Sequence, residues 1–261
     1  MQRVAIVGYG LIGGSIGLAL RERAPDVAVV PIDVGDPLSV ADGADLIVLA
    51  APISENIHIL DAIDRHVSGD ALVTDTGSTK ATTVMAAERL PVRLRFIGGH
   101  PIAGGTGAGF EAARPDLFSG RPWILTPTPG TREDDLAALR VFVENLGASV
   151  HLMDAAEHDR VLAYTSHLPQ LTASAVMHVV GQTVGETGLK FAGSGLRDTT
   201  RLAASPASIW RDIIASNRQN ANRALDDLIG ALQELRRQGG DDAVERIFAD
   251  AARWKRQLDA D

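Results

Sequence analysis

The sequence predicts an α/β protein in which a doubly wound parallel sheet is followed by an all-helical domain. Short apolar runs alternate with helical stretches in the first part of the chain, and no convincing strand follows residue 153. We expect the first domain to span residues 1–153 and the second to span residues 154–261. A chain of 261 residues, 45% hydrophobic and 22% charged, is long enough to form two modest domains with real cores.

Seven apolar runs in the first domain are expected to form strands. In chain order they are Val4–Val7, Val27–Ile32, Leu46–Leu49, Leu72–Thr74, Phe96–Gly98, Trp123–Thr126 and Val150–Leu152. Helices are expected between them at Leu11–Arg23, Glu55–His66, Ala81–Arg89 and Glu133–Asn145. Thr131 is placed to cap the last of these helices, because its hydroxyl can accept a free N–H of the first turn.

The second domain carries two helical signals. Ser205 followed by Pro206 is typical of a cap with proline at the first helical position. Further on, apolar residues recur at helical spacing and predict a long amphipathic helix: Ala221, Ala224, Leu225, Leu228, Leu232 and Leu235. Such helices pack within the chain or against a second copy. We expect a homodimer, with a monomeric helical cap as the alternative.

The turn after the first strand, Gly8-Tyr9-Gly10-Leu11-Ile12-Gly13, matches the G-x-G-x-x-G fingerprint of a Rossmann-like dinucleotide site. The first glycine would make the tight turn, the second would let the backbone approach a pyrophosphate, and the third would let the helix pack on the strand. The free N–H groups at the start of the helix favour an anion. We therefore expect cofactor contacts at Gly8, Gly10, Leu11, Ile12 and Gly13.

Asp33 follows the second strand and stands 20 residues after Gly13. A carboxylate at this place accepts hydrogen bonds from the adenosine ribose hydroxyls and repels a 2′-phosphate. No arginine stands beside it to receive such a phosphate. We therefore expect NAD rather than NADP as the cofactor, and an ordinary turn residue is the alternative for Asp33.

Composition excludes several classes of protein. The formal net charge is −8 and no dense basic stripe is present, so nucleic-acid binding is not expected. No apolar run approaches the roughly 20 residues of a membrane span. The absence of cysteine fits a cytoplasmic location. The seven histidines show no metal-ligand spacing, so we expect no metal site.

Two clusters in the first domain carry candidate chemistry. Thr74–Lys80 follows a strand, where Ser78 can donate a hydrogen bond to cofactor or substrate, although helix capping by Thr76 or Ser78 is equally compatible. His100 lies between two glycines and a proline, and we expect it on a loop at a strand end. A neutral imidazole can accept the proton of an alcohol while a hydride leaves the same carbon.

A third cluster is spread over the second domain. It comprises Glu157–Asp159, Ser166–Gln170 and Gly193–Arg201. Arg197 and Arg201 are four residues apart, which would place both guanidinium groups on one helical face. Arginine binds carboxylates through paired, planar hydrogen bonds, and ordinary surface salt bridges are the alternative for both residues.

Five stretches in this order resemble the prephenate dehydrogenase family, which includes arogenate and cyclohexadienyl dehydrogenases: GYGLIGGSIG, TDTGSTK, GGHPIAGG, EHDRVLAYTSHLPQ and GLRDTTRLA. The resemblance implies an NAD(P)-binding domain joined to a helical dimerisation domain. It also implies oxidative decarboxylation in tyrosine biosynthesis. In that reaction hydride leaves C4 of a cyclohexadienol, the hydroxyl proton goes to a base, and the ring carboxylate leaves as carbon dioxide.

The resemblance also implies roles for individual residues. His100 would be the base for the C4 hydroxyl, Ser78 would orient that hydroxyl and the nicotinamide, and Arg201 would be the main carboxylate anchor. Four further residues are implied to bind the substrate from the helical side: His167, Gln170, Arg197 and Trp210.

Two departures from the family pattern concern the substrate. Many relatives continue after HPIAG with Thr-Glu-Lys-Ser-Gly, whereas this chain has Gly105-Thr106-Gly107-Ala108-Gly109 and so lacks those polar side chains. Gln170 stands where many prephenate-preferring members carry histidine. An amide donates and accepts, so it suits the ammonium of arogenate as well as the keto group of prephenate.

Three other functions are compatible with parts of the pattern. One is dehydrogenation of an amino-substituted prephenate in a secondary pathway. A second is a hydroxyacid dehydrogenase or imine reductase of the same plan, but these rely on a catalytic lysine, and Lys190 is the only lysine between Met153 and Arg253. The third is an NAD-sensing module without catalysis, against which the set of His100, Ser78 and Arg201 argues.

Overall fold

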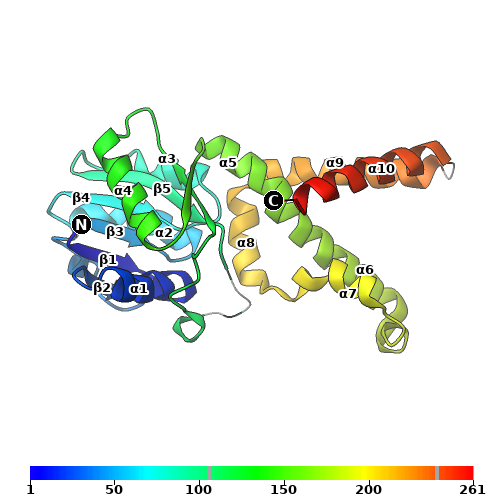
Figure 1. The fold of residues 1–261 in the computed structure, drawn as a ribbon, viewed down its shortest axis with the longest axis horizontal. Coiled ribbons are helices and arrows are strands. Elements are labelled where there is room, and N and C mark those ends of the chain that lie inside the picture. The colour runs from blue at the N-terminus through cyan, green and yellow to red at the C-terminus, as the bar shows by residue number, and fades with distance from the viewer. Residues whose placement is uncertain (105–106, 108, 239–240, 261) are drawn as a thin grey trace. The chain divides into compact units, whose positions relative to one another are not determined.

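A computed structural model describes residues 1–104, 107, 109–238 and 241–260, and the described part contains a seven-stranded sheet (Figure 1). Its strand order is β2-β1-β3-β4-β5-β6-β7. The strands are β1 (Arg3–Val7), β2 (Ala28–Ile32), β3 (Leu46–Leu49), β4 (Ala71–Asp75), β5 (Leu94–Pro101), β6 (Pro122–Thr126) and β7 (Ser149–Leu152). Each strand contains or overlaps one of the predicted apolar runs, so the predicted α/β fold is confirmed.

The sheet departs from the predicted parallel pattern at one pairing, after which β6 and β7 run opposite to the other strands. β1 to β5 pair in parallel, whereas β6 runs antiparallel to β5, and β7 is parallel to β6. The expectation that His100 lies on a loop was wrong, because β5 continues to Pro101 and pairs His100 with Ile124. Glycine permits this path, since a Cβ on Gly99 would lie 2.6 Å from the backbone oxygen of Asp75.

Helices cover both faces of the sheet and bury its apolar residues. On one face lie α1 (Leu11–Arg23) and α4 (Glu133–Asn145), and on the other lie α2 (Ile53–Ala62) and α3 (Ala81–Ala87). Short 3-10 segments occur at Leu38–Ala41, Ile63–Arg65 and Phe110–Ala112. Thr131 does not cap α4 as predicted: its hydroxyl accepts the Thr128 N–H at 2.9 Å, which closes the preceding turn.

After β7 the chain is helical. The elements up to Asn217 are α5 (Ala155–Leu162), a π-helical turn (Ala163–His167), α6 (Leu168–Leu189), α7 (Ser194–Thr199), the 3-10 turn η5 (Arg201–Ala204) and α8 (Ala207–Ser216). Pro169 follows the π turn directly, and it has no N–H to donate to the carbonyl four residues earlier. The Ser205 hydroxyl does not cap α8 as predicted but donates to Gln170 Oε1 at 3.1 Å.

Contacts within the chain divide it into two compact units, Met1–Asn217 and Arg218–Asp261. The second unit consists of α9 (Arg218–Gln238) and α10 (Asp241–Leu258). The predicted apolar stripe lies on α9, where Ala221 and Ala224 are buried and Leu232 is exposed. In the described part of the chain, no helix combines the length and the apolar character needed to cross a membrane.

Candidate active site

The glycine turn lies between β1 and α1, at the point where the strand order reverses. Gly8 has a φ of +93°, and its N–H donates to Ile32 O at 2.8 Å. A Cβ on Gly13 would lie 2.1 Å from Gly8 O, so only glycine lets α1 approach the turn this closely. A Cβ on Gly10 would meet no atom within 4 Å, which leaves open space beside the start of α1. The turn therefore fits the pyrophosphate of a dinucleotide.

Asp33 stands directly after β2, next to this turn. Its side chain is exposed, and its Oδ1 accepts the N–H of Val34 at 2.9 Å. Its own N–H donates to Asp36 Oδ2 at 2.9 Å, which closes the turn after the strand. Within the described residues the second carboxylate oxygen of Asp33 has no hydrogen-bond partner, so it fits the predicted contact with a ribose hydroxyl.

A buried ion pair follows β4. Lys80 and Asp75 are both fully buried, and the Lys80 ammonium pairs with Asp75 Oδ2. Lys80 Nζ also donates to Gly99 O at 2.7 Å, while Asp75 Oδ1 accepts the Gly99 N–H at 3.1 Å. The pair thus holds the backbone next to His100. Ser78, on the same turn, is half-buried, and its hydroxyl has no hydrogen bond to any described residue.

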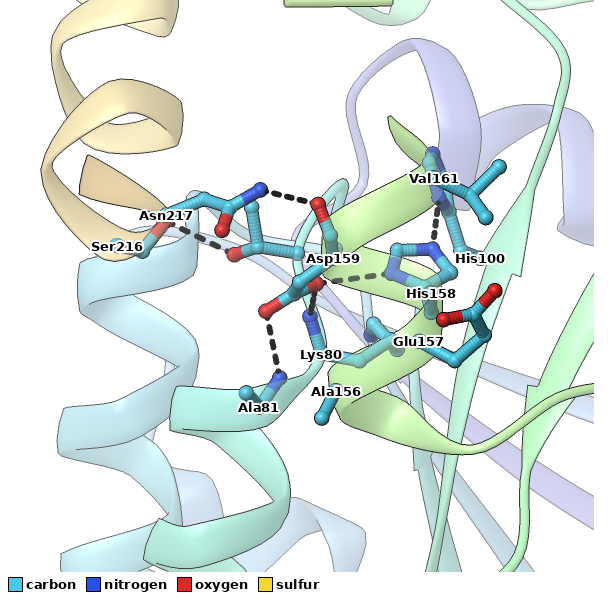
Figure 2. A network of polar contacts seen from close by, with 12 residues as sticks. Lys80, Ala81, His100, Ala156, Glu157, His158, Asp159, Val161, Ser216 and Asn217 are labelled. Carbon is cyan, nitrogen blue, oxygen red and sulfur yellow. Dashed lines mark hydrogen bonds and ion pairs between the residues drawn. The ribbon is translucent and has the colours of Figure 1, made fainter. Parts of the chain in front are cut away.

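His100 ends a chain of buried polar side chains (Figure 2). His100 Nδ1 lies 2.8 Å from His158 Nε2, and His158 Nδ1 lies 2.8 Å from Asp159 Oδ1. The Asp159 carboxylate accepts the backbone N–H of Lys80 at 2.7 Å and the backbone N–H of Ala81 at 3.0 Å. It therefore satisfies free N–H groups at the start of α3 and joins α5 to the sheet domain.

The surroundings of His100 keep its imidazole neutral near pH 7. Burial lowers the pKa of His100 well below its ordinary value, and the nearby His158, Lys80 and His167 lower that pKa further. A neutral imidazole has one ring nitrogen with a lone pair. The site can therefore accept a proton from a hydroxyl group.

His167 lies at the end of the π turn and is 1% exposed. Its Nδ1 is 3.3 Å from Asn217 Nδ2, which also donates to the backbone oxygen of Asp159 at 2.7 Å. The ring of Trp210 stands edge-on to His167, with ring centroids 6.1 Å apart. His167 Nε2 is buried and has no partner among the described residues. This nitrogen is free for a ligand.

Gln170 is buried on α6, and its amide holds the turn that begins with Arg201. Its Nε2 donates to Leu202 O at 2.9 Å and to Ser174 Oγ at 3.2 Å, and its Oε1 accepts the Ser205 hydroxyl. Both amide protons are therefore used within the protein, and an acceptor lone pair of Oε1 remains.

The two arginines do not share a helical face as predicted. Arg197 lies on α7, which ends at Thr199, and Arg201 begins the separate turn η5. The backbone of Thr200, with φ −102° and ψ 10°, breaks the helix between them. Both side chains are exposed, and neither forms an ion pair with another described residue. Three positions of the loop noted above, Gly105, Thr106 and Ala108, lie outside the described residues.

Sequence reasoning singled out His100 but not the groups that support it. It assigned no role to His158, Asp159, Lys80 or Asn217, although the first three stand in the motifs already quoted. The available signal was chemical: charged or imidazole side chains placed directly beside apolar, core-forming residues need buried partners.

The fold and the site define a dinucleotide-dependent dehydrogenase. A glycine turn at the switch point of a parallel sheet fits the cofactor, and a buried neutral histidine stands at the same edge of the sheet.

Comparisons with known proteins give the family. Residues 11–152 match the family model of the prephenate dehydrogenase nucleotide-binding domain, and residues 154–250 match that of the prephenate dehydrogenase dimerization domain. The prephenate dehydrogenase of Bacillus subtilis is 31% identical over 267 residues, which cover 94% of this chain and 72% of that protein. The cyclohexadienyl dehydrogenase of Zymomonas mobilis is 31% identical over 257 residues, covering 90% and 87%.

A solved structure agrees with these matches. The prephenate dehydrogenase from A. aeolicus, in complex with hydroxyphenyl propionate and NAD+, superposes with a TM-score of 0.90 at 29% identity, covering 100% of this chain and 99% of that one. The chain belongs to the prephenate dehydrogenase family. It is an NAD-dependent dehydrogenase of tyrosine biosynthesis, which confirms the expected cofactor and enzyme class.

Proposed function

We propose that this enzyme oxidatively decarboxylates a cyclohexadienol, with prephenate or arogenate as its substrate. The observation that carries the proposal is the buried, neutral His100 at the sheet edge that also bears the glycine turn. The similarity to a prephenate and a cyclohexadienyl dehydrogenase supports both substrates, and Gln170 in place of the family histidine leaves the choice between them open.

The proposed reaction needs one group that accepts a proton and another that holds the carboxylate. NAD+ supplies the hydride acceptor when it is bound. His100 takes the proton of the C4 hydroxyl as the hydride leaves C4. The bond from the ring to its carboxylate then breaks, carbon dioxide leaves, and the electron pair makes the ring aromatic as the C4 oxygen regains a proton.

The remaining roles are proposed for side chains that the described protein leaves available. Ser78 would orient the C4 hydroxyl, because its own hydroxyl is unpaired in the described chain. Arg201 would bind the ring carboxylate, and Arg197 would add positive charge. Two groups near the π turn, His167 Nε2 and the Trp210 ring, would contact the substrate, and Gln170 would both hold η5 and offer its remaining lone pair.

The functions of the two domains are also a proposal. Residues 1–153 would bind NAD, and residues 154–261 would complete the substrate site and form a homodimer in the cytoplasm. The two family matches, which meet at residues 152 and 154, support this border. The match to a dimerization domain supports the proposed homodimer.

A side-by-side assay tests the function. Purified full-length protein is supplied with prephenate or arogenate, each with NAD or NADP, and reduced cofactor is followed by absorbance. We expect turnover with NAD and at least one substrate. Turnover with neither substrate would refute the proposal, and a preference for NADP would contradict the role of Asp33.

Variants in the same assay test the residue roles. We expect His100→Ala to abolish turnover and Arg201→Ala to lower kcat/KM by at least about tenfold, because each removes a group that binds the reacting part of the substrate. Arg140→Ala, an exposed arginine on α4, is the matched control and should retain the wild-type rate. Full activity in both site variants would refute their roles.

A further inference from the structure

His158 and Asp159 have no part in the reaction proposed above, yet they are buried beside its base. His158 is 0% exposed and Asp159 is 2% exposed. The ring of His158 bridges His100 Nδ1 and Asp159 Oδ1, with 2.8 Å to each (Figure 2). Burying such a chain costs free energy unless every member is hydrogen-bonded. It therefore matters which ring nitrogen carries each proton in this series of hydrogen-bonded side chains.

The partners of Asp159 determine those positions. Its Oδ1 accepts the backbone N–H of Lys80 and its Oδ2 accepts the backbone N–H of Ala81, so both oxygens act as acceptors. His158 must then donate from Nδ1. When this is the only proton on the ring, Nε2 of His158 has the lone pair. That lone pair requires a proton on His100 Nδ1. The Nε2 atom of His100 is consequently the one left with a lone pair.

We propose that His158 and Asp159 are positioning residues, which hold His100 in the tautomer whose Nε2 accepts the substrate hydroxyl proton. The inference rests on the proposed role of His100 as the base. Once Nε2 is protonated, His100 carries a positive charge and donates from Nδ1 to His158 Nε2. The single N–H of His158, on Nδ1, points to the Asp159 carboxylate, which stabilises that charge through the bridging ring. The proton returns from Nε2 to the product oxygen.

Other charged and titratable groups around His100 oppose the same charge. Burial lowers the pKa of His100 most, and His158, then Lys80 from the β4–α3 turn, then His167 from the π turn lower that pKa further. Asp75 is already paired with Lys80. The Asp159 carboxylate is therefore the nearby negative group that is directed at His100, and it acts through His158.

The first test reads the tautomer without any turnover. Histidine with isotopically labelled ring nitrogens is incorporated, and nitrogen chemical shifts at about pH 8, where unperturbed imidazole is neutral, distinguish a protonated ring nitrogen from one with a lone pair. The His100 signals are assigned by their loss in His100→Gln. We expect a proton on Nδ1 and a lone pair on Nε2. A proton on Nε2 of His100 in the wild-type protein would overturn the proposal.

The second test compares two substitutions of the bridging residue. His158→Gln keeps a strong acceptor that can reach His100 Nδ1, whereas His158→Met has a similar volume and only a weakly accepting thioether. We expect His158→Met to shift the His100 proton partly to Nε2 and to lower kcat by at least about 100-fold. His158→Gln should keep the wild-type tautomer and most of kcat. KM for substrate and the Kd for NAD should stay within about threefold in both variants.

The outcomes separate this inference from the proposed function. Equal kcat values for His158→Met and His158→Gln would overturn the positioning role. The expected tautomer in a protein that turns over neither prephenate nor arogenate would support the hydrogen-bond chain while refuting the proposed substrates.

Discussion

His167 is a single residue whose ionisation is linked to folding. Burial lowers its pKa from 6.5 to about 4, with Asp159 raising it and His158 lowering it further. The unfolded chain therefore binds an additional proton between about pH 4 and pH 6.5. The contribution of His167 to stability is complete above this window and is lost as the pH falls through it.

We expect the titration of His167 to lower the free energy of unfolding by roughly 2 to 3 kcal/mol when the pH falls from about 7 to about 4.5. Urea titrations at the two pH values measure the change. His167→Gln is the control, because an amide does not titrate in this range, and its loss should be smaller than that of the wild type by the same amount. Equal losses in the two proteins would contradict the assignment.

Lys80 and Asp75 form a second test at the scale of residues. Removing one partner of a buried ion pair leaves an uncompensated charge, so Lys80→Met should lower the free energy of unfolding by about 3–5 kcal/mol. The double variant Lys80→Met with Asp75→Asn removes that charge and should lose less than the sum of the single variants. Additive losses, measured by urea unfolding, would show that the pair is not coupled.

The turn between β1 and α1 is the element in which neighbouring glycines have different functions. A Cβ on Gly13 would meet Gly8 O at 2.1 Å, whereas a Cβ on Gly10 would enter open space. Gly13→Ala should therefore destabilise the protein without cofactor by more than about 2 kcal/mol, because helix and turn must separate. Gly10→Ala should keep stability within about 1 kcal/mol of the wild type.

Gly10→Ala, which should leave stability almost unchanged, should instead weaken cofactor binding. In Gly10→Ala the methyl group occupies the space expected for the pyrophosphate, so we expect the Kd for NAD to rise by at least about tenfold. Calorimetry of the folded variant measures this Kd. An unchanged Kd in Gly10→Ala would indicate that the pyrophosphate lies elsewhere.

Elements were predictable from the sequence where local pattern alone decides them. The strands follow from buried apolar runs, and α1 and α4 agree with prediction at both ends. Strand direction is not encoded in such runs, so the antiparallel pairing of β6 could not be foreseen. The extension of β5 through His100 was hidden because glycine and proline usually end strands, whereas here they permit close packing against Asp75.

The candidate site was predictable only in part, because its contacts join distant segments. His100 and His158 are 58 residues apart in the sequence, and His167 and Asn217 are 50 apart. Spacing along the chain says nothing about such pairs. The four-residue spacing of Arg197 and Arg201 was misleading for a related reason. The helix ends before Thr200, and the next turn, η5, is held by a hydrogen bond from the distant Gln170.

At the scale of the whole molecule, the unit formed by α9 and α10 bears on assembly. Large apolar side chains are exposed on it: Ile229, Leu232, Val244, Phe248, Trp254 and Leu258. A monomer rarely exposes so many in one small unit, which is consistent with the proposed homodimer. Light scattering at micromolar concentration that detected only a 27.6 kDa species would rule the dimer out.

Phe248→Asp should weaken the dimer, because it places a charge on apolar surface that a second copy would cover. We expect the population to shift toward the 27.6 kDa monomer, measured by sedimentation over a range of concentrations. Gln257→Asp adds the same charge at an exposed polar position of α10 and should leave the equilibrium unchanged. Identical behaviour of the two variants would exclude this face from the interface.

The pairing of β5 with β6 through His100 also has a consequence for how such an enzyme diversifies. The proposed proton acceptor, His100, is anchored in the sheet, whereas the groups proposed to recognise the rest of the substrate stand on the π turn, α6 and η5. With these proposed roles, substitutions in the helical segments alone should exchange a keto-acid preference for an amino-acid preference. The part of the site proposed to be catalytic would then stay the same while the substrate preference changes.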